Sequence, residues 1–410
     1  MVTGDTDGQS EDTSHERRSY LKLAGASMAG AIGGVALYRT VEGFESRSES
    51  GFGDDSSSIA VSEPTVSALR DAIDTLGTDP GTITVESERI EDIGDNVVIP
   101  SNTHLRGTGQ GSTRLRFTDD PDLELAGLLR VEGSDVVISD MTLDGNRAEV
   151  DLSRRNDGQE YGLYTSGAER VAVRRVTATS FPGYGFDPHA NDSGPSRDIV
   201  LADCRATNNG YDGITFAGVE TGSIRDCVSY QNDRHGVNMT DEEGHDITVK
   251  NAVSRENGGC GLVVQNLTGD VTVTASSFRG NVDSGIRLGS GGGLSRNVTV
   301  TDNRISSNGS YGLNVRLAQQ VVISDNVFRR NDEFGEATAE IVIKGAEEQF
   351  SQSIQVSENV IECRNSTGWA VEERPMSGPT VIVHNLVENA GNRPFRTDHR
   401  DTVVRENVSA

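Results

Sequence analysis

One short pattern recurs along the second half of the chain and limits what it can fold into: an Asn, three variable residues, a Gly, then alternating apolar residues. The Asn positions have successive spacings of 23, 25, 24, 27 and 23 residues, and they are Asn209, Asn232, Asn257, Asn281, Asn308 and Asn331. Self-similarity at such a period is typical of stacked supersecondary units. The segments between them, such as "NVTVTDNRI", carry Val, Ile and Thr at alternate positions and leave too little room for helices. The pattern therefore predicts an all-β solenoid, a parallel β-helix whose neighbouring coils lie about 4.8 Å apart.

The fixed positions of the repeat should stack from coil to coil. We expect the Asn side chains to form an amide ladder along one turn. The Gly column comprises Gly213, Gly236, Gly261, Gly285, Gly312 and Gly335, and Gly162 and Gly185 extend it upstream. Two cysteines share this frame, because Cys204 and Cys227 each lie nine residues before a column Gly. They form either a disulfide across adjacent coils or two stacked buried thiols, and the thiols are favoured.

An amphipathic segment precedes the coils. In "SEPTVSALRDAIDTLG" the apolar residues Val66, Leu69, Ile73 and Leu76 recur at helical spacing, and Ser62 is the expected N-cap. This short helix should cover the open N-terminal end of the solenoid. Residues 63–410 are therefore assigned to a single parallel β-helix domain.

The N-terminal residues read as a targeting signal. Arg17 and Arg18 in "ERRSYLKLAGASMAGAIGGVALYRT" lead into a short run of small and weakly apolar residues. That run is too short to predict a stable membrane span, and residues 1–40 resemble a twin-arginine export signal. A buried N-terminal helix is the alternative. Residues 41–62, rich in Ser, Gly, Asp and Glu, are predicted to be a flexible linker. The export signal predicts that the domain lies outside the cell or at its surface.

The charge of the chain is strongly negative. There are 63 Asp and Glu against 37 Lys and Arg, a formal net charge of -26, and only Lys22, Lys250 and Lys344 are lysines. Such a surface is typical of a protein that stays soluble in concentrated salt, where self-repulsion is screened. We therefore interpret the chain as halophilic, with an ordinary acidic protein as the alternative. Nucleic acid is excluded as a partner, because no segment carries the basic footprint that phosphate binding requires.

Alignment of the coils on their Gly residues brings chemically active side chains onto one outward face. The predicted cluster comprises Tyr184, Asp187, His189, Asp212, Arg234 and His235, with Tyr161 and Tyr164 on the preceding coil. A single outward His or Asp on a solenoid is usually solvated surface. The convergence of two His, two Asp, a Tyr and an Arg on three consecutive coils is what favours a site. Later coils place a blander set of residues, Cys260, Ser284, Thr338, Val263 and Arg287, at the corresponding positions.

Five strings in this region resemble a known family. They are "TLDGNR" (142–147), "GYGFDPH" (183–189), "NGYDG" (209–213), "NDRHGVN" (232–238) and "NGGCGLVVQ" (257–265). Together they are similar to the catalytic module of mannuronan (alginate) C5-epimerases, members of the pectate-lyase-like superfamily, over roughly residues 60–400. The resemblance implies a right-handed parallel β-helix. The calcium-binding nonapeptide modules that often follow in that family are absent, since "GSGGGLSRN" lacks their Asp pattern.

The resemblance also implies roles for individual residues. The catalytic centre would be Tyr184, Asp187, His189 and Asp212. The expected substrate-binding residues are Arg155, Arg234, His235, Tyr164 and Asn238; Arg155 stands where the family has a Lys, which leaves substrate preference open. No cofactor is required for the chemistry, and a structural Ca²⁺ is possible. The expected partner is an anionic polyuronate, bound by a monomeric protein.

The chemistry explains why such groups would gather. Inverting C5 of a uronic acid residue removes a proton next to a carboxylate, which a cation or a protonated acid must neutralise. Asp187 and Asp212 should have raised pKa values because like charges disfavour ionisation, and His189 and Tyr184 are the pair available to move protons. The residues do not decide which is base and which is acid. A polyuronate lyase, which expels the C4 oxygen instead, is the runner-up, and a non-catalytic glycan-binding β-helix is the third hypothesis.

Overall fold

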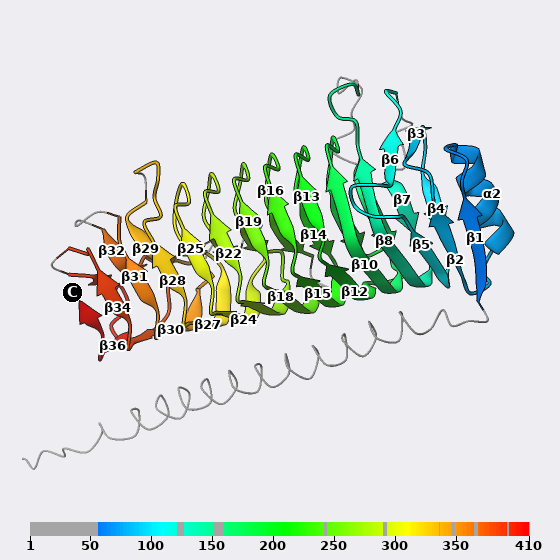
Figure 1. Cartoon of the computed structure of the whole chain (residues 1–410). Helices are drawn as coiled ribbons and strands as arrows, with labels where there is room; N and C mark the ends of the chain where they lie inside the picture. Colours follow the sequence, from blue (N-terminus) through cyan, green and yellow to red (C-terminus); the bar gives the residue numbers. More distant parts are fainter. Residues whose placement is uncertain are drawn as a thin grey trace, which may run out of the picture.

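The computed structural model describes residues 56–409 except 121–126, 151–159, 242–243, 290–292, 336, 347–348, 365–367 and 392. The predicted export signal, residues 1–40, lies outside this part of the chain. The described residues form an all-β, right-handed parallel solenoid with one short helix at its N-terminal end, as the repeat and the resemblance predicted (Figure 1). Most of the buried apolar side chains form one continuous core inside the coils.

Each coil contributes one short strand to a 12-stranded parallel sheet, called sheet B here. Its strands are β4 (Val97–Ile99), β7 (Gly127–Val131), β9 (Tyr161–Ser166), β11 (Phe186–His189), β14 (Ile214–Ala217), β17 (Val237–Thr240), β20 (Leu262–Val264), β23 (Ile286–Leu288), β26 (Leu313–Val315), β29 (Ala339–Ile343), β32 (Trp369–Glu373) and β35 (Phe395–Arg396). They pair in chain order, so a side chain on one coil lies beside its counterpart on the next. Sheet B positions the candidate site.

The remaining strands form a 25-stranded sheet, sheet A, with two columns that the long strands β8 and β10 join. The first column contains β1 (Ser57–Val61), β2 (Gly81–Val85), β5 (Thr103–Arg106), β8 (Ser134–Asp144), β10 (Glu169–Thr179), β12 (Ser196–Ala202), β15 (Val219–Arg225), β18 (His245–Lys250), β21 (Gly269–Thr274), β24 (Ser295–Thr301), β27 (Ala318–Ser324), β30 (Gln352–Ser357), β33 (Thr380–Val383) and β36 (Val403–Arg405). The second adds β3 (Arg89–Ile93), β6 (Arg114–Phe117), β13 (Arg205–Thr207), β16 (Val228–Tyr230), β19 (Val253–Arg255), β22 (Ser277–Arg279), β25 (Arg304–Ser306), β28 (Val327–Arg329), β31 (Val360–Glu362), β34 (Leu386–Glu388) and β37 (Val408–Ser409).

The predicted amide ladder runs along the turn between sheet A and sheet B. Nδ2 of Asn209 donates to Oδ1 of Asn232 at 2.9 Å, and the same contact repeats from coil to coil as far as Asn331. All six amides are buried. Each side chain also accepts from the backbone N–H of the preceding coil, as Asn232 does from Asn209. The ladder therefore satisfies buried polar groups at a bend where strand pairing stops.

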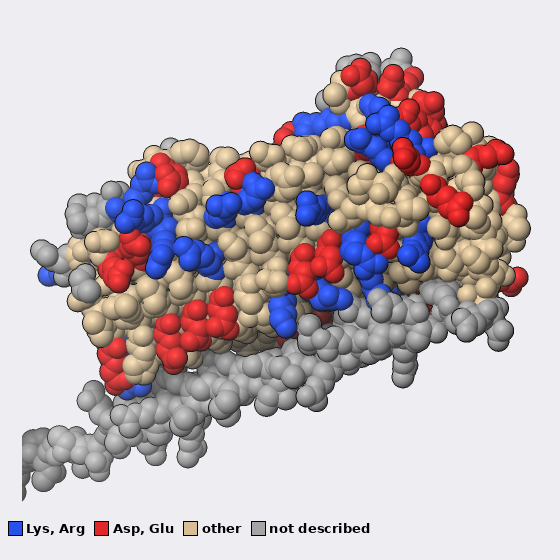
Figure 2. All heavy atoms as spheres, in the orientation of Figure 1, with Lys and Arg blue, Asp and Glu red and all other residues tan. Residues whose placement is uncertain are grey.

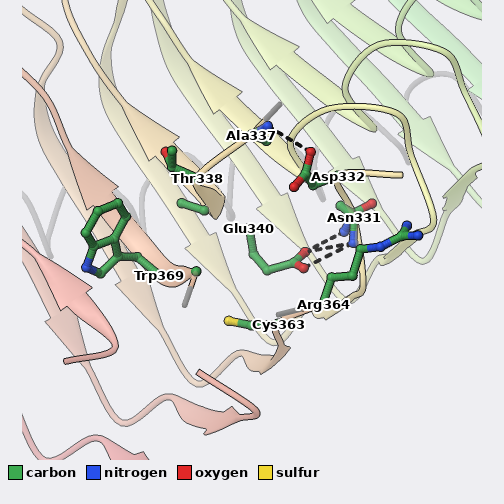
Figure 3. Close-up of a pocket in the computed structure, with 10 residues that line it drawn as sticks. Asn331, Asp332, Ala337, Thr338, Glu340, Cys363, Arg364 and Trp369 are labelled. Carbon is green, nitrogen blue, oxygen red and sulfur yellow. Dashed lines mark hydrogen bonds between the residues drawn. The ribbon is translucent and has the colours of Figure 1, made fainter. Parts of the chain in front are cut away.

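The ladder ends at a buried carboxylate rather than at another amide. Nδ2 of Asn331 donates to Oε2 of Glu340 at 2.6 Å, and its backbone N–H donates to the same group (Figure 3). The pairing of Leu313 with Ile341 places Glu340, and not Gly335, in the Gly column. The assignment of Gly335 to that column was wrong, because extra residues between Asn331 and Glu340 form a loop that spacing alone does not reveal.

A second ladder, which the sequence did not reveal, fills the bend between the two columns of sheet A. It links Asn303, Asn326, Asn359, Asn385 and Asn407 at 2.9 to 3.0 Å. Upstream coils place Cys204 and Cys227 at the same bend, where each thiol lies near backbone carbonyls. Both are free buried thiols, as favoured above. This column contains small side chains in the upstream coils and Asn in the downstream coils, so no single residue type marks it in the sequence.

The helix α2 (Val66–Leu76) packs against β1, β2 and β3 and covers the N-terminal end of the solenoid, as predicted (Figure 1). Its N-cap is Thr65, whose Oγ1 accepts from the N–H of Ala68 at 3.2 Å, so the assignment to Ser62 was wrong. Pro64 explains the difference. An N-cap at Ser62 would require helical backbone angles at Glu63, and these are disfavoured for the residue before a proline. The strand β1 also lies inside residues 41–62, so the solenoid begins earlier than the predicted boundary at residue 63.

Charged side chains are dispersed on the face shown in Figure 2. Lys and Arg lie there in several separate groups, most of them beside Asp or Glu. None of the described helices is long and apolar enough to cross a membrane.

Candidate active site

The four coils that contain β9, β11, β14 and β17 bring the predicted residues together on the outer face of sheet B. The pairings of Phe186 with Leu163 and with Ile214 set the register. One column, two positions before these strand residues, therefore contains Tyr161, Tyr184, Asp212 and His235 in successive coils. A second column pairs Asp187 with Tyr164 and Thr215 with Asn238. The register inferred from the Gly spacing holds through the whole site.

Asp212 is the hub of the cluster and is fully buried. Nε of Arg234 donates to Oδ1 at 2.7 Å, and its Nη2 reaches Oδ2, which makes a two-point ion pair. The backbone N–H of His235 donates at 2.8 Å, Nδ2 of Asn238 at 3.0 Å and Oγ1 of Thr215 at 3.2 Å. Five donors surround one carboxyl group, so its acceptor sites are filled and its orientation is fixed.

Asp187 and His189 form a second pair of ionisable side chains, on β11. The Asp187 side chain is 3% exposed, and its Oδ1 has no hydrogen-bond partner among the described residues. Burial raises the pKa of the Asp187 carboxyl, and the charge of Asp212 acts in the same direction. Nδ1 of His189 lies 3.4 Å from Oδ2 of Asp187, close enough for an ion pair but without hydrogen-bond alignment. That carboxylate raises the pKa of His189 above its ordinary value.

A tyrosine stack supports Tyr184. Its ring lies 5.2 Å from the ring of Tyr161 and 5.3 Å from that of Tyr211, nearly parallel to both. The guanidinium of Arg234 lies 5.4 Å from the centroids of Tyr184 and Tyr211. Burial raises the pKa of Tyr184 to about 12, against the opposing effect of Arg234. Tyr184 therefore keeps its proton at neutral pH and is held in one orientation.

Proline at position 188 interrupts pairing on one side only. On the β9 side, Asp187, Pro188 and His189 all pair with their counterparts. On the β14 side, only Phe186 and His189 do. Because proline has no N–H and fixes φ, it suits a strand that presents Asp187 and His189 outward with little flexibility.

The other expected substrate-binding residues fall into two groups. Tyr164 lies beside the site, with its ring 5.8 Å from the ring of His189, and Asn238 bridges Asp212 and Gln265. Arg155 lies outside the described residues. Tyr211 is a site residue that sequence reasoning missed. It directly precedes Asp212, at a turn position that strand register does not place on the outer face.

A cavity beside the C-terminal end of the first ladder lies away from this site. It has a volume of about 250 Å³ and is lined by Asp332, Glu340, Arg364 and Trp369 among others (Figure 3). The strands β29 and β32 that border it lie six and seven coils beyond β11 along sheet B. No group of three or more His, Cys, Asp or Glu side chains in the described part of the chain could hold a metal ion.

Comparisons with known proteins agree with the β-helix fold. A family model described as "right handed beta helix region" matches residues 126–296 and 292–408. Mannuronan C5-epimerase AlgE2 of Azotobacter vinelandii is 37% identical over 182 residues, 43% of this chain and 18% of that protein. Alginate lyase 7 of the same organism is 33% identical over 163 residues, 37% of this chain and 18% of that protein.

Among solved structures, the A-module of Azotobacter vinelandii mannuronan C5-epimerase AlgE6 superposes with a TM-score of 0.75 and 26% identity. The superposition covers 86% of this chain and 99% of that module. The chain spans less than a fifth of the length of the two curated relatives above. It belongs to the right-handed β-helix family and is homologous to the A-modules of mannuronan C5-epimerases.

Proposed function

We propose that this protein is a polyuronate C5-epimerase, which converts mannuronate to guluronate or glucuronate to iduronate within a polysaccharide. One observation carries the proposal: His189, Tyr184 and Asp187, whose Oδ1 has no partner among the described residues, converge around the Arg234–Asp212 pair on one face of sheet B. That set contains a base, an acid and a group that can neutralise a carboxylate. The homology to epimerase A-modules supports the same reaction.

The first requirement is to weaken the negative charge of the substrate carboxylate. Asp187 is suited to this when protonated, because its raised pKa favours the neutral acid and its free Oδ1 is available to donate a hydrogen bond. Arg234 is fixed by Asp212, so its guanidinium faces the site without side-chain reorganisation. Arg155, in our proposal, holds a neighbouring carboxylate. Preorganised groups of this kind stabilise the charge that develops on the carboxylate as the C5 proton leaves.

Proton transfer then needs one base and one acid on opposite faces of the sugar. Neutral His189 takes the proton from C5. The electron pair of the broken C5–H bond is delocalised into the substrate carboxylate. Tyr184, which stays protonated because its pKa is about 12, delivers a proton to the other face of C5. Each cycle removes one proton and returns one, so Tyr184 and His189 exchange their starting protonation states and must re-equilibrate through solvent. The proposal assigns no step to a metal ion or cofactor, and a structural Ca²⁺ stays a prediction.

Lyase chemistry is the second candidate, because the same intermediate can expel the C4 oxygen and form a C4–C5 double bond. The similarity to alginate lyase 7 supports lyase activity as the second candidate function. Epimerisation is preferred because the similarity to epimerases extends over more of this chain.

The test is incubation with polymannuronate and, separately, polyglucuronate in concentrated salt and D₂O, followed by NMR. An epimerase introduces deuterium at C5 of inverted residues, and a lyase produces unsaturated chain ends. Unchanged polymers of both kinds, with a protein that is folded by circular dichroism, contradict both proposals. A His189→Ala variant that retains full activity would also contradict the assigned site, and binding without turnover would favour the non-catalytic alternative.

We also propose that residues 1–40 direct export by the twin-arginine route, supported by Arg17 and Arg18 before the small-residue run. Replacement of both arginines with lysine should leave the protein inside the producing cell. Secretion of that variant at the normal level contradicts the proposal. In this proposal the protein acts outside the cell as a halophilic monomer. Gel filtration in concentrated salt checks that it is a monomer.

A further inference from the structure

The protonation of His235 follows from its contacts. The backbone N–H of Cys260 donates to its Nδ1 at 2.9 Å, so this nitrogen carries a lone pair. Burial lowers the pKa of His235 to about 4, so the ring is neutral at working pH and its single proton resides on Nε2. Neighbouring charges oppose one another here, because Asp212 and Asp283 raise the pKa while Arg287 and Arg234 lower it.

The ring of His235 is held in this orientation by a glycine. A Cβ atom at Gly259 would lie 2.4 Å from Nδ1 of His235, closer than real contacts allow. The backbone of the next coil therefore lies directly against one edge of the ring. Nε2 lies on the side of the ring that Arg287 approaches.

Arg287 approaches that edge from two coils further on. Its Nη2 lies 3.3 Å from Nε2 of His235. Because both atoms carry protons, this contact brings two donors together rather than forming a hydrogen bond. The arrangement lacks an acceptor between them.

Arg287 is also incompletely paired. Its side chain is only 19% exposed, and its one ion pair within the described part of the chain is a 3.3 Å contact from Nη1 to Oδ2 of Asp283. That oxygen also accepts from the thiol of Cys260. Nε of Arg287 is buried and has no partner among the described residues. A mostly buried guanidinium with a free donor is costly unless an anion completes it.

We propose that Nε2–H of His235 and the guanidinium of Arg287 together form an anion subsite that binds one carboxylate of the polyuronate. The inference deepens the proposed function and rests on it for the identity of the ligand. In register, Arg287 lies on β23, four coils from Asp187, and its side chain points back toward the catalytic cluster. The subsite therefore binds a sugar next to the reacting residue, on the C-terminal side of the groove. Arg287 is thus a specificity-determining residue that the resemblance did not indicate.

The experiment measures binding without requiring turnover. Oligomannuronate and oligoglucuronate of defined length are titrated by calorimetry, at one fixed salt concentration, into the wild type, Arg287→Gln and Arg287→Lys. Arg279→Gln is the matched control, since Arg279 is exposed on β22 and its loss changes the charge equally. A second readout is the ¹⁵N and ¹H signal of Nε2 of His235 during the titration.

We expect Arg287→Gln to bind the preferred oligomer roughly ten- to hundredfold more weakly than Arg279→Gln, the effect of losing hydrogen bonds to a charged group. Arg287→Lys should recover part of the loss, and the His235 signal should shift only where binding occurs. Equal affinity of the two Gln variants, or no wild-type affinity for either oligomer, overturns the subsite. If binding depends on Arg287 but no deuterium enters C5, the subsite stands and the epimerase proposal fails.

Discussion

Nδ1 of His189 lies 3.4 Å from Oδ2 of Asp187, two residues away on the same strand, and this contact raises the pKa of the imidazole above its ordinary value of 6.5. In the proposed reaction His189 is neutral and Asp187 is protonated, so the pair holds one proton in its active state. Activity should then fall as pH rises through the pKa of His189, above 6.5, where that proton is lost. The pH dependence of kcat/KM, measured by C5 deuterium exchange, checks this.

The Asp187→Asn variant tests the cause of that shift. Asp187 is the main group that raises the pKa of His189, whereas burial lowers it, so in the variant the pKa of His189 should be 6.5 or below and activity should rise as pH passes through it. The rate should also fall, because the amide cannot act as a neutral acid of the same strength. Direct NMR titration of His189 in both proteins separates the two effects. A pH profile of the same shape in wild type and variant contradicts this account.

The Arg234–Asp212 pair should affect activity more than stability. Removing Arg234 leaves a buried carboxylate with three remaining donors, which costs about 1 to 2 kcal/mol. This is less than the roughly 3 to 5 kcal/mol for a fully buried pair, because the Arg234 side chain is 39% exposed. Turnover by Arg234→Gln should fall at least about a hundredfold.

The double variant Arg234→Gln, Asp212→Asn removes both charges, so it should regain most of the lost stability and none of the activity. Urea unfolding and initial rates measure the two properties separately, with exposed Arg205→Gln as the control for one lost charge. Recovery of activity in the double variant would mean that the pair only stabilises the fold.

The glycine that supports His235 gives a separate prediction. Gly259→Ala places a methyl group 2.4 Å from Nδ1 of His235, so the ring must move. We expect a loss of about 1 to 3 kcal/mol from overpacking, together with weaker polymer binding and at least tenfold lower kcat/KM. Gly111→Ala is the matched control, because its Cβ would meet no atom within 4 Å. Equal kinetics for the two variants would show that the orientation of His235 does not matter.

The sequence predicted what depends on a regular period. Tyr184, Asp212 and His235 share a column because each directly precedes a position of the Gly register, and that register needs no three-dimensional information. Tyr211 was missed because it occupies a turn, where the side-chain direction follows from local backbone angles rather than from strand alternation. Arg287 was treated as bland, since its importance comes from a long side chain that reaches back across two coils.

Errors arose where the period was interrupted. The loop after Asn331 shifted the true Gly-column position from Gly335 to Glu340, and spacing counts cannot distinguish an inserted loop from a normal turn. The second ladder was hidden because Cys204 and Cys227 occupy the column before any Asn appears. Cys thiols and Asn amides both contact backbone groups at the same bend. A search for a repeated Asn alone therefore does not find the upstream part of this column.

The buried end of the first ladder predicts a pH-dependent stability. Burial raises the pKa of the Glu340 carboxyl from 4.5 to about 7. Between these values the folded protein binds more protons than the unfolded chain, so stability is lost as pH rises from about 4.5 to 7. The total is about 3 kcal/mol. Glu340→Gln retains an acceptor for Asn331 and removes the titration.

The free energy of unfolding of Glu340→Gln, relative to wild type, should therefore increase across this range and level off above pH 8. Exposed Glu88→Gln controls for the loss of one negative charge. Urea unfolding at several pH values provides the comparison. A difference that stays constant with pH would show that Glu340 is ionised in the folded protein throughout, and that the ladder tolerates a charged end.

The charge of the chain predicts a strong dependence on salt. At a formal charge of -26, repulsion among carboxylates opposes folding, and the screening length falls from about 10 Å at 0.1 M salt to about 3 Å at 1 M. Salt also weakens favourable pairs such as Arg70–Asp95, but exposed pairs of this kind contribute at most about 1 kcal/mol each. Because 63 acidic residues face only 37 basic ones, the relief of repulsion should prevail. The free energy of unfolding should therefore rise between 0.1 and 2 M KCl. Sucrose, which stabilises without screening, is the control, and stability that responds to sucrose but not to KCl contradicts the halophilic interpretation.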